Sequence, residues 1–218
     1  MIVMDINKYL QELEEAKKTP DWILEMERFA KENNVPIMEP NGISFLKQCI
    51  QLRKPSKILE IGTAIGYSSL QMLEAHPDAT IVTLERNPDM VHVAKKNIRK
   101  RNKEEAIMIL EGDALELKHE VEKHAPFDMI FIDAAKGQYQ HFFELYEPML
   151  SHAGVIITDN VLFKGFVAND NDAPKRLKNM INKIRGFNNW LMKRNDYETN
   201  IYPIGDGIAL SIKKQENR

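Results

Sequence analysis

The sequence predicts an α/β fold built on a mostly parallel sheet, and two features of the chain predict it. From Lys57 onward, five short apolar segments alternate with stretches that have helical periodicity. Their interiors are so largely apolar that we expect helices on both faces of the sheet, as in parallel sheets with crossover helices. The five strand candidates are residues 57–62, 80–85, 106–112, 127–133 and 154–160.

The two ends of the chain predict other elements. Residues 6–18, 21–33 and 41–52 have apolar residues every three or four positions, which is typical of helices with one buried stripe. Near the C-terminus, residues 197–214 follow a long basic helix and contain Gly205-Asp206-Gly207, a turn that would pair two strands antiparallel. We therefore expect one domain, residues 1–218. It would have a helical N-terminal cover (1–55) and a core (57–214) with a seven-stranded sheet in which one strand is antiparallel.

Composition restricts the class of protein. The chain has 218 residues and a net charge of −2. This length is enough for one hydrophobic core that needs no disulfides or metal ions for stability. No apolar run approaches the roughly 18 to 20 residues that a membrane span needs, so we expect no membrane partner. The first residues lack the pattern of a secretory signal, which makes the cytoplasm the expected location. The single cysteine, Cys49, excludes an intramolecular disulfide.

The basic residues are unevenly distributed. Between Lys164 and Arg194 there are eight basic residues and two acidic ones, a local charge of +6. A second basic run covers residues 95–103. Each run is consistent with a solvated helix face, and the first is equally consistent with a surface that contacts phosphates.

The ends of the first three strands indicate a nucleotide-like ligand. The first strand runs into a loop with Gly62 and Gly66, where the chain can turn tightly before a helix begins. The dinucleotide fingerprint does not match, because Ala64 occupies the place of its middle glycine. Glu85 ends the second strand, where an acid can hold a ribose, and Asp113 follows the third.

The ends of the next two strands indicate a metal ion. Asp133 ends the fourth strand, and Asp159 and Asn160 end the fifth. Adjacent parallel strands lie about 4.8 Å apart, so these side chains can converge. Three oxygen donors without His or Cys favour Mg²⁺ or Ca²⁺ over zinc. Lys136 lies close enough in sequence to accept a proton from a substrate hydroxyl or to stabilise the resulting anion, although a lysine in an ion pair is the plainer alternative.

The segments ILEIGTAIGYS, FIDAAKGQY and ITDNVLFKG, together with the acid in TLERN, resemble the metal-dependent class I O-methyltransferases of the catechol and caffeoyl-CoA type. The resemblance covers roughly residues 35 to 212. It implies a Rossmann-like fold, S-adenosylmethionine and Mg²⁺ as cofactors, and a homodimer. It also implies the following roles. Met38, Glu60, Gly62, Tyr67, Ser68, Glu85, Gly112, Asp113, Ala114 and Asp133 would bind the cofactor; Asp133, Asp159 and Asn160 would bind Mg²⁺; and Lys136 would be catalytic.

Four runs, VPIME, FIDAAKGQYQ, LYEPML and GVIITDNVLFKG, more closely resemble the bacterial members that methylate 5-hydroxyuridine at the tRNA wobble position. The resemblance thus implies the tRNA anticodon loop as partner, whose unpaired bases can be splayed into a pocket. Metal chemistry does not choose the substrate, because a catechol and 5-hydroxyuridine each present two neighbouring oxygens. A small catechol-like phenol therefore stays an alternative substrate, and a non-catalytic RNA-binding module is a third hypothesis.

Overall fold

The computed structural model describes residue 9, residues 12 and 13, and residues 18–214. The chain forms two compact units, Met1–Val35 and Pro36–Arg218, and each is considered by itself. The first contains helix α2 (Asp21–Glu32), which agrees with the predicted helix over residues 21–33 to within one residue. The helix expected over residues 6–18 falls mostly outside the described residues. How the first unit lies relative to the sheet, and hence the single-domain cover, stays a prediction.

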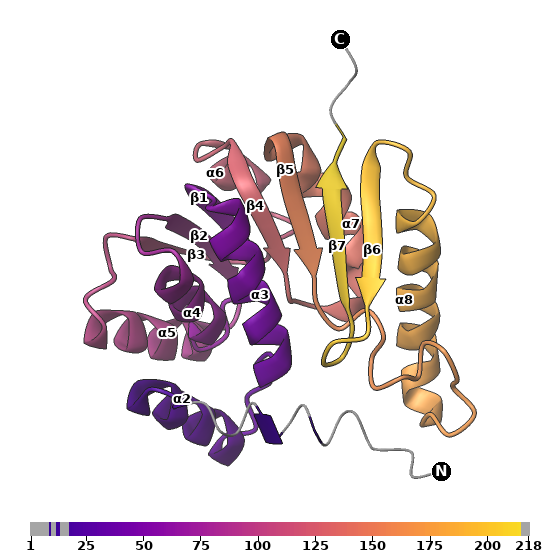
Figure 1. Ribbon diagram of the computed structural model, residues 1–218, viewed down its shortest axis with the longest axis horizontal. Helices are drawn as coiled ribbons and strands as arrows, with labels where there is room; N and C mark the ends of the chain where they lie inside the picture. Colours follow the sequence, from indigo (N-terminus) through magenta and orange to yellow (C-terminus); the bar gives the residue numbers. More distant parts are fainter. Residues whose placement is uncertain (1–8, 10–11, 14–17, 215–218) are drawn as a thin grey trace. The chain divides into compact units, whose positions relative to one another are not determined.

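The second unit is built on a seven-stranded sheet with the order β3-β2-β1-β4-β5-β7-β6 (Figure 1). Strand β7 is antiparallel to both of its neighbours, and all other pairs are parallel. The expected seven strands, with one of them antiparallel, are confirmed. The strands are β1 (Lys57–Ile61), β2 (Thr80–Glu85), β3 (Ile107–Glu111), β4 (Phe127–Ile132), β5 (Leu150–Thr158), β6 (Tyr197–Tyr202) and β7 (Ile208–Lys213).

Strand β5 begins at Leu150, earlier than the predicted Gly154. Leu150 pairs with Phe127, and the register then shifts before Met129 pairs with Val155. Such an irregularity inserts residues that break the apolar pattern, so the sequence there did not predict a strand. Within this irregular part of the pairing, Ser151 Oγ of β5 donates to Asp128 Oδ1 of β4 at 3.0 Å.

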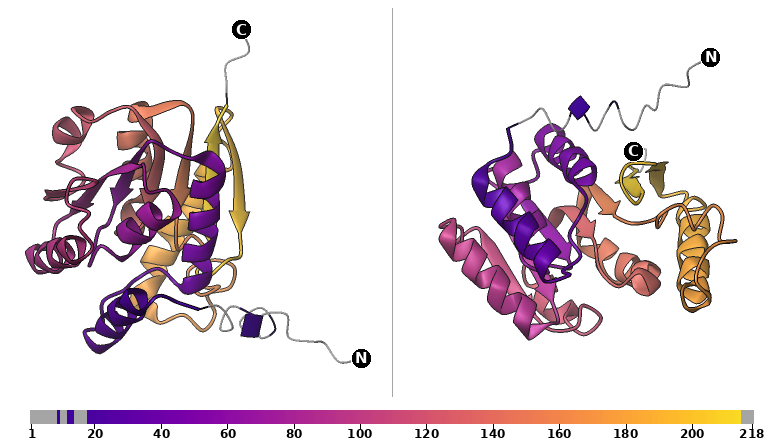
Figure 2. Two further views of the ribbon diagram at one scale, coloured as in Figure 1. Left: turned by 60° about the vertical axis from the view of Figure 1, so that its left-hand side comes forward. Right: turned by 90° about the horizontal axis from the view of Figure 1, so that it is seen from below.

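Helices cover both faces of the sheet (Figures 1 and 2). Side chains alternate between the two faces of β1, so Glu60 points to one face and Leu59 and Ile61 to the other. Glu60 meets α4, which also packs on α3, whereas Leu59 and Ile61 belong to the core cluster that contains side chains of α6, α7 and α8. The helices of this unit are α3 (Pro40–Arg53), α4 (Tyr67–Ala75), α5 (Pro88–Lys100), α6 (Lys118–Glu122), α7 (Tyr139–Tyr146) and α8 (Lys178–Leu191), with short 3₁₀ turns η1 (Lys136–Gln138), η2 (Glu147–Met149) and η3 (Lys175–Leu177).

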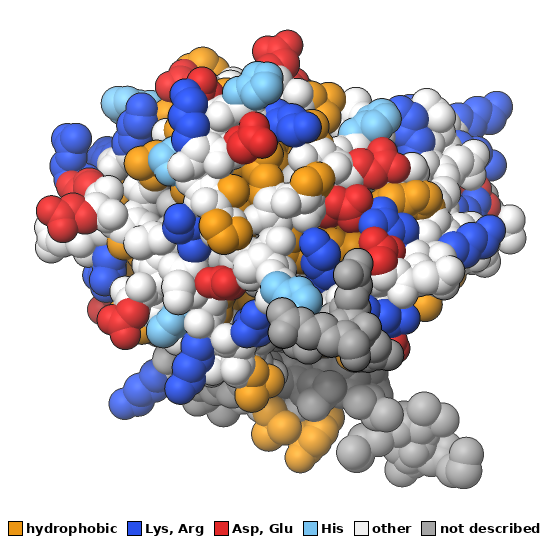
Figure 3. All heavy atoms as spheres, turned by 90° about the horizontal axis from the view of Figure 1, so that it is seen from above, with side chains coloured by type: hydrophobic (Ala, Val, Ile, Leu, Met, Phe, Trp, Pro, Cys, Tyr) orange, Lys and Arg blue, Asp and Glu red, His pale blue; other side chains and the backbone are white. Residues whose placement is uncertain are grey.

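The surface at the amino ends of the parallel strands carries mixed charge. In Figure 3, Lys and Arg side chains are interspersed with Asp and Glu side chains on this face. A surface of mixed sign gives little attraction to a polyanion. Among the described helices, none combines the length and apolar character that crossing a membrane requires.

Candidate active site

The site lies at the edge of the sheet where the carboxyl ends of the parallel strands meet. Ile61 and Ile132 are paired in the register, and backbone pairing continues beyond them. Asp133 N donates to Ile61 O at 2.9 Å, and Asp159 N donates to Ile132 O at 3.0 Å. The loop that starts at Gly62, Asp133 and Asp159 therefore become neighbours, at the edge where open α/β sheets bind ligands.

Asp133, Asp159 and Asn160 form one polar cluster, so the structure brings together all three predicted metal ligands. Asn160 Nδ2 donates to Asp159 Oδ2 at 2.8 Å and to Asp133 Oδ1 at 3.3 Å. Asn160 has a φ of 63°, in the left-handed region that few residues other than glycine adopt. Asparagine adopts this region more readily than most residues, and with this backbone its amide contacts the two carboxyl groups.

The two carboxyl groups lie in surroundings that disfavour their negative charge. Burial, and then the charge of Asp133, raise the pKa of Asp159 to about 8. Burial also raises the pKa of Asp133, and the positive charge of Lys136 acts in the opposite direction. A divalent cation would favour the charged forms of both groups. It would therefore stabilise these buried carboxylates more than it would stabilise exposed ones.

The donor set fits a hard divalent cation such as Mg²⁺. The amide N–H groups of Asn160 contact the two carboxylates, as a cation would. Rotation of the amide group would turn its oxygen toward such a cation. In the described part of the chain there is no group of three or more His, Cys, Asp and Glu side chains able to hold a metal. A third donor at this site would therefore be the amide of Asn160, and Mg²⁺ usually leaves further positions to water or substrate.

A cavity of about 300 Å³ opens beside this cluster. Asp159, Asn160 and Lys136 line it together with Met38, which is 4% exposed. Lys136 belongs to η1, and its Nζ lies 5.9 Å from the centroid of the Phe163 ring, another part of the wall. The predicted catalytic lysine thus shares one cavity with two of the three predicted metal ligands.

Gly62 is explained by the close approach of the end of β4. Its φ is 109°, and a Cβ atom at this position would lie 2.0 Å from the carbonyl oxygen of Asp133. Any side chain would force the loop after β1 away from Asp133. The sequence indicated Gly62 as part of a cofactor loop, and the contact with Asp133 adds a second reason for glycine.

Glu85 ties the end of β2 to the same loop. Its Oε2 accepts a hydrogen bond from Ala64 N and its Oε1 accepts one from Asn87 N, both at 2.9 Å. Each carboxylate oxygen can still accept another hydrogen bond, for instance from a ribose hydroxyl. Gly112 N donates to Glu85 O at 2.9 Å, which places the turn after β3 next to it.

Asp113 and Ala114 form that turn. Asp113 Oδ1 accepts a hydrogen bond from Leu115 N at 2.9 Å. Ala114 is buried, and its carbonyl accepts a hydrogen bond from the Tyr146 hydroxyl at 2.5 Å. The predicted adenine-binding residues thus form a turn fixed by α7, at the same edge of the sheet.

Glu60, which was predicted to line the cofactor, is fully buried behind the loop. Its carboxyl group accepts hydrogen bonds from the hydroxyls of Ser68, Ser69 and Thr83. Burial raises its pKa to about 7, although the three hydroxyls act against this rise. Glu60 holds Ser68 at the start of α4, beside the buried Tyr67. Glu60 would therefore act on a ligand indirectly, by fixing the position of Ser68.

Phe163 and Asp206 are among the residues of the cavity wall that were not predicted. Phe163 N donates to Asp206 O at 2.9 Å. The sequence around Asp206 was interpreted only as a turn. The structure gives its neighbour Gly207 a reason to be glycine, because a Cβ there would lie 2.4 Å from Leu162 Cγ.

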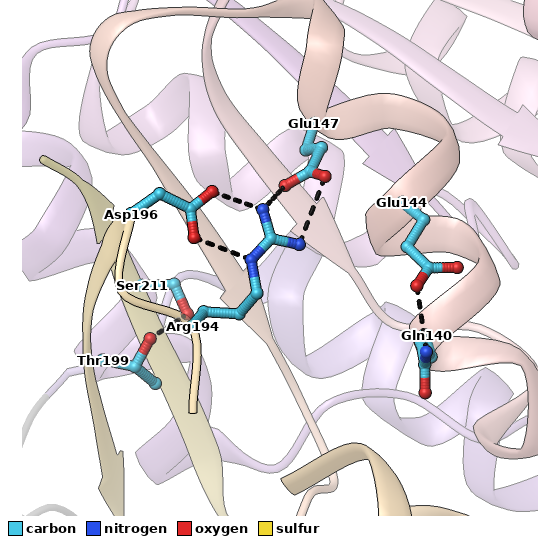
Figure 4. A network of polar contacts seen from close by, with 7 residues as sticks. All are labelled: Gln140, Glu144, Glu147, Arg194, Asp196, Thr199 and Ser211. Carbon is cyan, nitrogen blue, oxygen red and sulfur yellow. Dashed lines mark hydrogen bonds and ion pairs between the residues drawn. The ribbon is translucent and has the colours of Figure 1, made fainter. Parts of the chain in front are cut away.

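Two of the eight basic residues of the +6 segment are engaged within the protein. Arg194 pairs with Glu147 and Asp196 (Figure 4). Arg185 Nη1 lies 3.2 Å from Asp170 Oδ2, and its Nε donates to a backbone carbonyl. The remaining cations, Lys164, Lys175, Arg176, Lys178, Lys183 and Lys193, are exposed.

Comparison with known proteins agrees with this fold. The family model described as "O-methyltransferase" matches residues 12–214. A catechol O-methyltransferase of Niastella koreensis is 34% identical over 186 residues, which are 81% of this chain and 82% of that protein. A solved structure of a putative caffeoyl-CoA O-methyltransferase from Staphylococcus aureus is 42% identical and has a TM-score of 0.89, over 96% of this chain and 100% of that one. An O-methyltransferase from Bacillus cereus, solved in complex with SAH, is 25% identical with a TM-score of 0.81, over 96% and 97%.

The fold and the site together define a class I S-adenosylmethionine-dependent methyltransferase. The chain belongs to the O-methyltransferase family, and within it to the catechol and caffeoyl-CoA type.

Proposed function

We propose that this chain transfers the methyl group of S-adenosylmethionine to the 5-hydroxyl of 5-hydroxyuridine at the tRNA wobble position. The product is 5-methoxyuridine, and Mg²⁺ is the metal cofactor. The cluster of Asp133, Asp159 and Asn160 beside the cavity of Lys136 carries this proposal. The 5-hydroxyl neighbours the 4-carbonyl of the base, so both oxygens can reach one cation. The four sequence runs given above favour the nucleoside as the substrate.

The chemistry divides between the bound groups and the residues of the chain. Bound Mg²⁺ supplies the charge that lowers the pKa of the substrate hydroxyl, and S-adenosylmethionine supplies the methyl group. Lys136 accepts the proton of that hydroxyl or stabilises the oxygen anion left by its loss. With the cofactor bound, Lys136 would hold the substrate oxygen in the cavity while that oxygen takes the methyl group.

The cofactor would bind along the ends of β1, β2 and β3. Glu85 suits the ribose, because its carboxylate already faces the loop at Ala64 and can accept further hydrogen bonds. Ser68 at the start of α4 would face the methionine part, held by Glu60. The remaining proposed contacts are Met38, Gly62, Tyr67, Gly112, Asp113, Ala114 and Asp133.

The polar face of α8 supports a polyanionic substrate. Residues 173–195, which include η3 and α8, contain no Asp or Glu. Lys175, Arg176 and Lys178 are exposed at the start of this stretch. A Cβ at Gly137 would lie 3.3 Å from Lys183 Cδ, so the basic face extends to the turn that carries the proposed catalytic lysine. Such a face can contact phosphates while a base occupies the cavity.

Methyl transfer from labelled S-adenosylmethionine to tRNA containing 5-hydroxyuridine tests the proposal. We expect Mg²⁺-dependent transfer that stops with a chelator. We also expect a fall of about 100-fold or more in Asp159→Ala and in Asn160→Ala, since the metal would lose a direct ligand. Asp172→Ala, which changes an exposed carboxylate of a loop, is the control and should keep full activity. Full activity of the parent in metal-free buffer would remove the mechanism.

A small catechol-like phenol is a second candidate substrate, favoured by the 34% identity to a catechol O-methyltransferase. Turnover of catechol that greatly exceeds turnover of the tRNA would favour this candidate. A third outcome is that calorimetry detects no binding of S-adenosylmethionine, and a non-catalytic RNA-binding module would then fit better. Mass spectrometry of wobble uridines from cells that lack the protein distinguishes these alternatives. Loss of 5-methoxyuridine is expected only if the tRNA is the substrate.

A further inference from the structure

The segment that follows Asn160, residues 161–165, has an uncommon backbone conformation. Phe163 and Lys164 have φ values of 42° and 54°, and Gly165 has a φ of 79°. Bulky side chains rarely adopt this left-handed region, so the conformation of Phe163 persists only where the surrounding structure holds it. Contacts that hold this segment therefore also determine where Asn160 and the cavity residue Phe163 lie.

The turn between β6 and β7 holds the N–H groups of the segment. Val161 N donates to Gly207 O at 2.9 Å. Leu162 N and Phe163 N both donate to Asp206 O, also at 2.9 Å. These bonds leave the carbonyl groups of the segment to other partners.

Asn188 of α8 holds one of these carbonyl groups. Its Nδ2 donates to Val161 O at 2.8 Å, although the two residues lie 27 positions apart in the chain. Val161 is buried and directly follows Asn160. The peptide group between Asn160 and Val161 is thus held by Gly207, and the next one is held by Asn188. Together these two bonds fix the backbone that carries the third proposed metal ligand.

The amide of Asn188 acts only as a donor here. Its Oδ1 is buried and has no hydrogen-bond partner among the residues that the structure describes. An unpaired buried oxygen is unfavourable, so the bond to Val161 is the favourable contribution of this amide. Asn188 is not one of the described residues that line the cavity, and its effect on a ligand would therefore pass through Val161.

We propose that Asn188 is a positioning residue of the metal site, which fixes the backbone after Asn160 so that the Asn160 amide stays beside Asp133 and Asp159. This inference rests on the metal site of the proposed function and extends that site to α8. A cation would then bind to ligands that are already in place, whereas without Asn188 it would have to order the segment on binding.

Asn188→Leu tests the inference, because leucine has about the same size and cannot donate a hydrogen bond. Titration calorimetry of the full chain with Mg²⁺ alone should show a dissociation constant raised about 10-fold or more. The rise in the midpoint of thermal unfolding produced by subsaturating Mg²⁺ should be smaller than in the parent. If the leucine variant does not fold, Asn188→Ala removes the same donor without adding volume and is expected to give the same result.

The metal-free protein separates this role from a merely structural one. Loss of the bond to Val161 and loss of the unpaired oxygen have opposite effects on the metal-free midpoint, so we expect Asn188→Leu to change it little. A side chain with only a structural role would lower that midpoint and leave the dissociation constant for Mg²⁺ unchanged. An unchanged dissociation constant overturns the inference, whatever the midpoint.

Asn189→Leu is the matched control. It makes the same exchange at the next residue of α8, which is exposed. We expect this variant to bind Mg²⁺ like the parent. If the parent itself binds no Mg²⁺, the proposed metal site and the role of Asn188 fail together. If the parent binds Mg²⁺ and Asn188→Leu binds it equally well, only the role of Asn188 is overturned.

Discussion

Glu60 is a buried acid that couples the stability of the chain to pH. Its pKa is raised by burial to about 7, against an ordinary value of 4.5. Between these two values the folded chain keeps a proton that the unfolded chain has lost. The free energy of unfolding therefore falls as the pH rises from about 4.5 to 7, by up to roughly 3 kcal/mol from this group alone.

We expect Glu60→Gln to remove this contribution, because glutamine stays neutral and can still hydrogen-bond to the surrounding hydroxyls. Urea denaturation of metal-free parent and variant at pH 5 and pH 8 measures the effect. The stability of the variant relative to the parent should improve at pH 8 by up to roughly 3 kcal/mol. Asp133 and Asp159 also have raised pKa values, but they are present in both proteins, so they largely cancel in the comparison. A stability difference that does not change with pH would contradict the role given to Glu60.

At the same scale, residues at strand ends could be predicted from the sequence and residues defined by buried contacts could not. Asp133, Asp159 and Asn160 each follow an apolar run, so a pattern along the chain was enough to predict them. The role of Glu60 depends on hydroxyls from α4 and β2, and the cavity wall depends on Phe163 and Asp206, which meet although they lie far apart in the chain. Neither arrangement can be recognised from the order of residue types along the chain.

At the scale of elements, Arg194 joins α7, α8 and β6 (Figure 4). It follows the end of α8, and its Nη2 lies 2.6 Å from Glu147 Oε2, just after α7. It also binds Asp196, just before β6. Its guanidinium carbon lies 5.0 Å from the Trp190 ring centroid and 5.3 Å from that of Tyr197. Planar stacking and paired hydrogen bonds of this kind are specific to arginine.

Arg194→Ala should lower the free energy of unfolding by about 2 kcal/mol, because Glu147 loses its partner in a largely buried place and the aromatic rings lose their cation. Arg194→Lys should recover less than half of this loss, since lysine cannot form the paired hydrogen bonds. Chemical denaturation measures both. Lys193→Ala, at an exposed neighbouring position, is the control and should change stability by less than about 0.5 kcal/mol. Equal effects of Lys193→Ala and Arg194→Ala would show that the contacts of Arg194 with Glu147 and Asp196 contribute little to the stability of the protein.

The extents of the elements were predictable where one pattern ran without interruption. β1 to β4 were predicted to within one residue at each end, because each is a compact apolar run. β5 began early because the register shift separates Leu150 from the apolar run that follows. The 3₁₀ turn of Lys136 could not be predicted either, since three residues hold no period.

At the scale of the whole molecule, the strand order creates the site. The chain moves outward from β1 to β3 and then returns to place β4 on the other side of β1. This switch lets the loop after β1 lie beside Asp133 and lets Asp133 lie beside Asp159. The sequence predicted the strands and their common edge. Their order came from the family resemblance rather than from periodicity, because short apolar runs do not specify their neighbours.

The distribution of charge gives the last prediction. The exposed cations of η3 and α8 lie on a stretch without acids, whereas those of α5 lie near acids, as in the pair of Lys95 with Glu111 at 3.9 Å. If the first group contacts tRNA phosphates, its loss should weaken tRNA binding and reduce the salt dependence of that binding. We therefore expect a triple variant that replaces Lys175, Arg176 and Lys178 with Gln to raise the KM for tRNA about 10-fold or more at moderate ionic strength.

The matched control is a second triple variant, with Gln at positions 95, 96 and 100 of α5, which removes the same charge on the other face of the sheet. Net charge alone would affect both triple variants equally, whereas a specific RNA surface would affect only the first. Titration of tRNA at several salt concentrations adds a second measure. Each lost phosphate contact lowers the slope of log K against log salt by about 0.7 to 0.9, so the first variant should lose roughly two to three such steps and the second none. Equal slopes for the parent and both variants would show that α8 does not contact the RNA, and the cavity would then have to recognise its substrate without help from this helix.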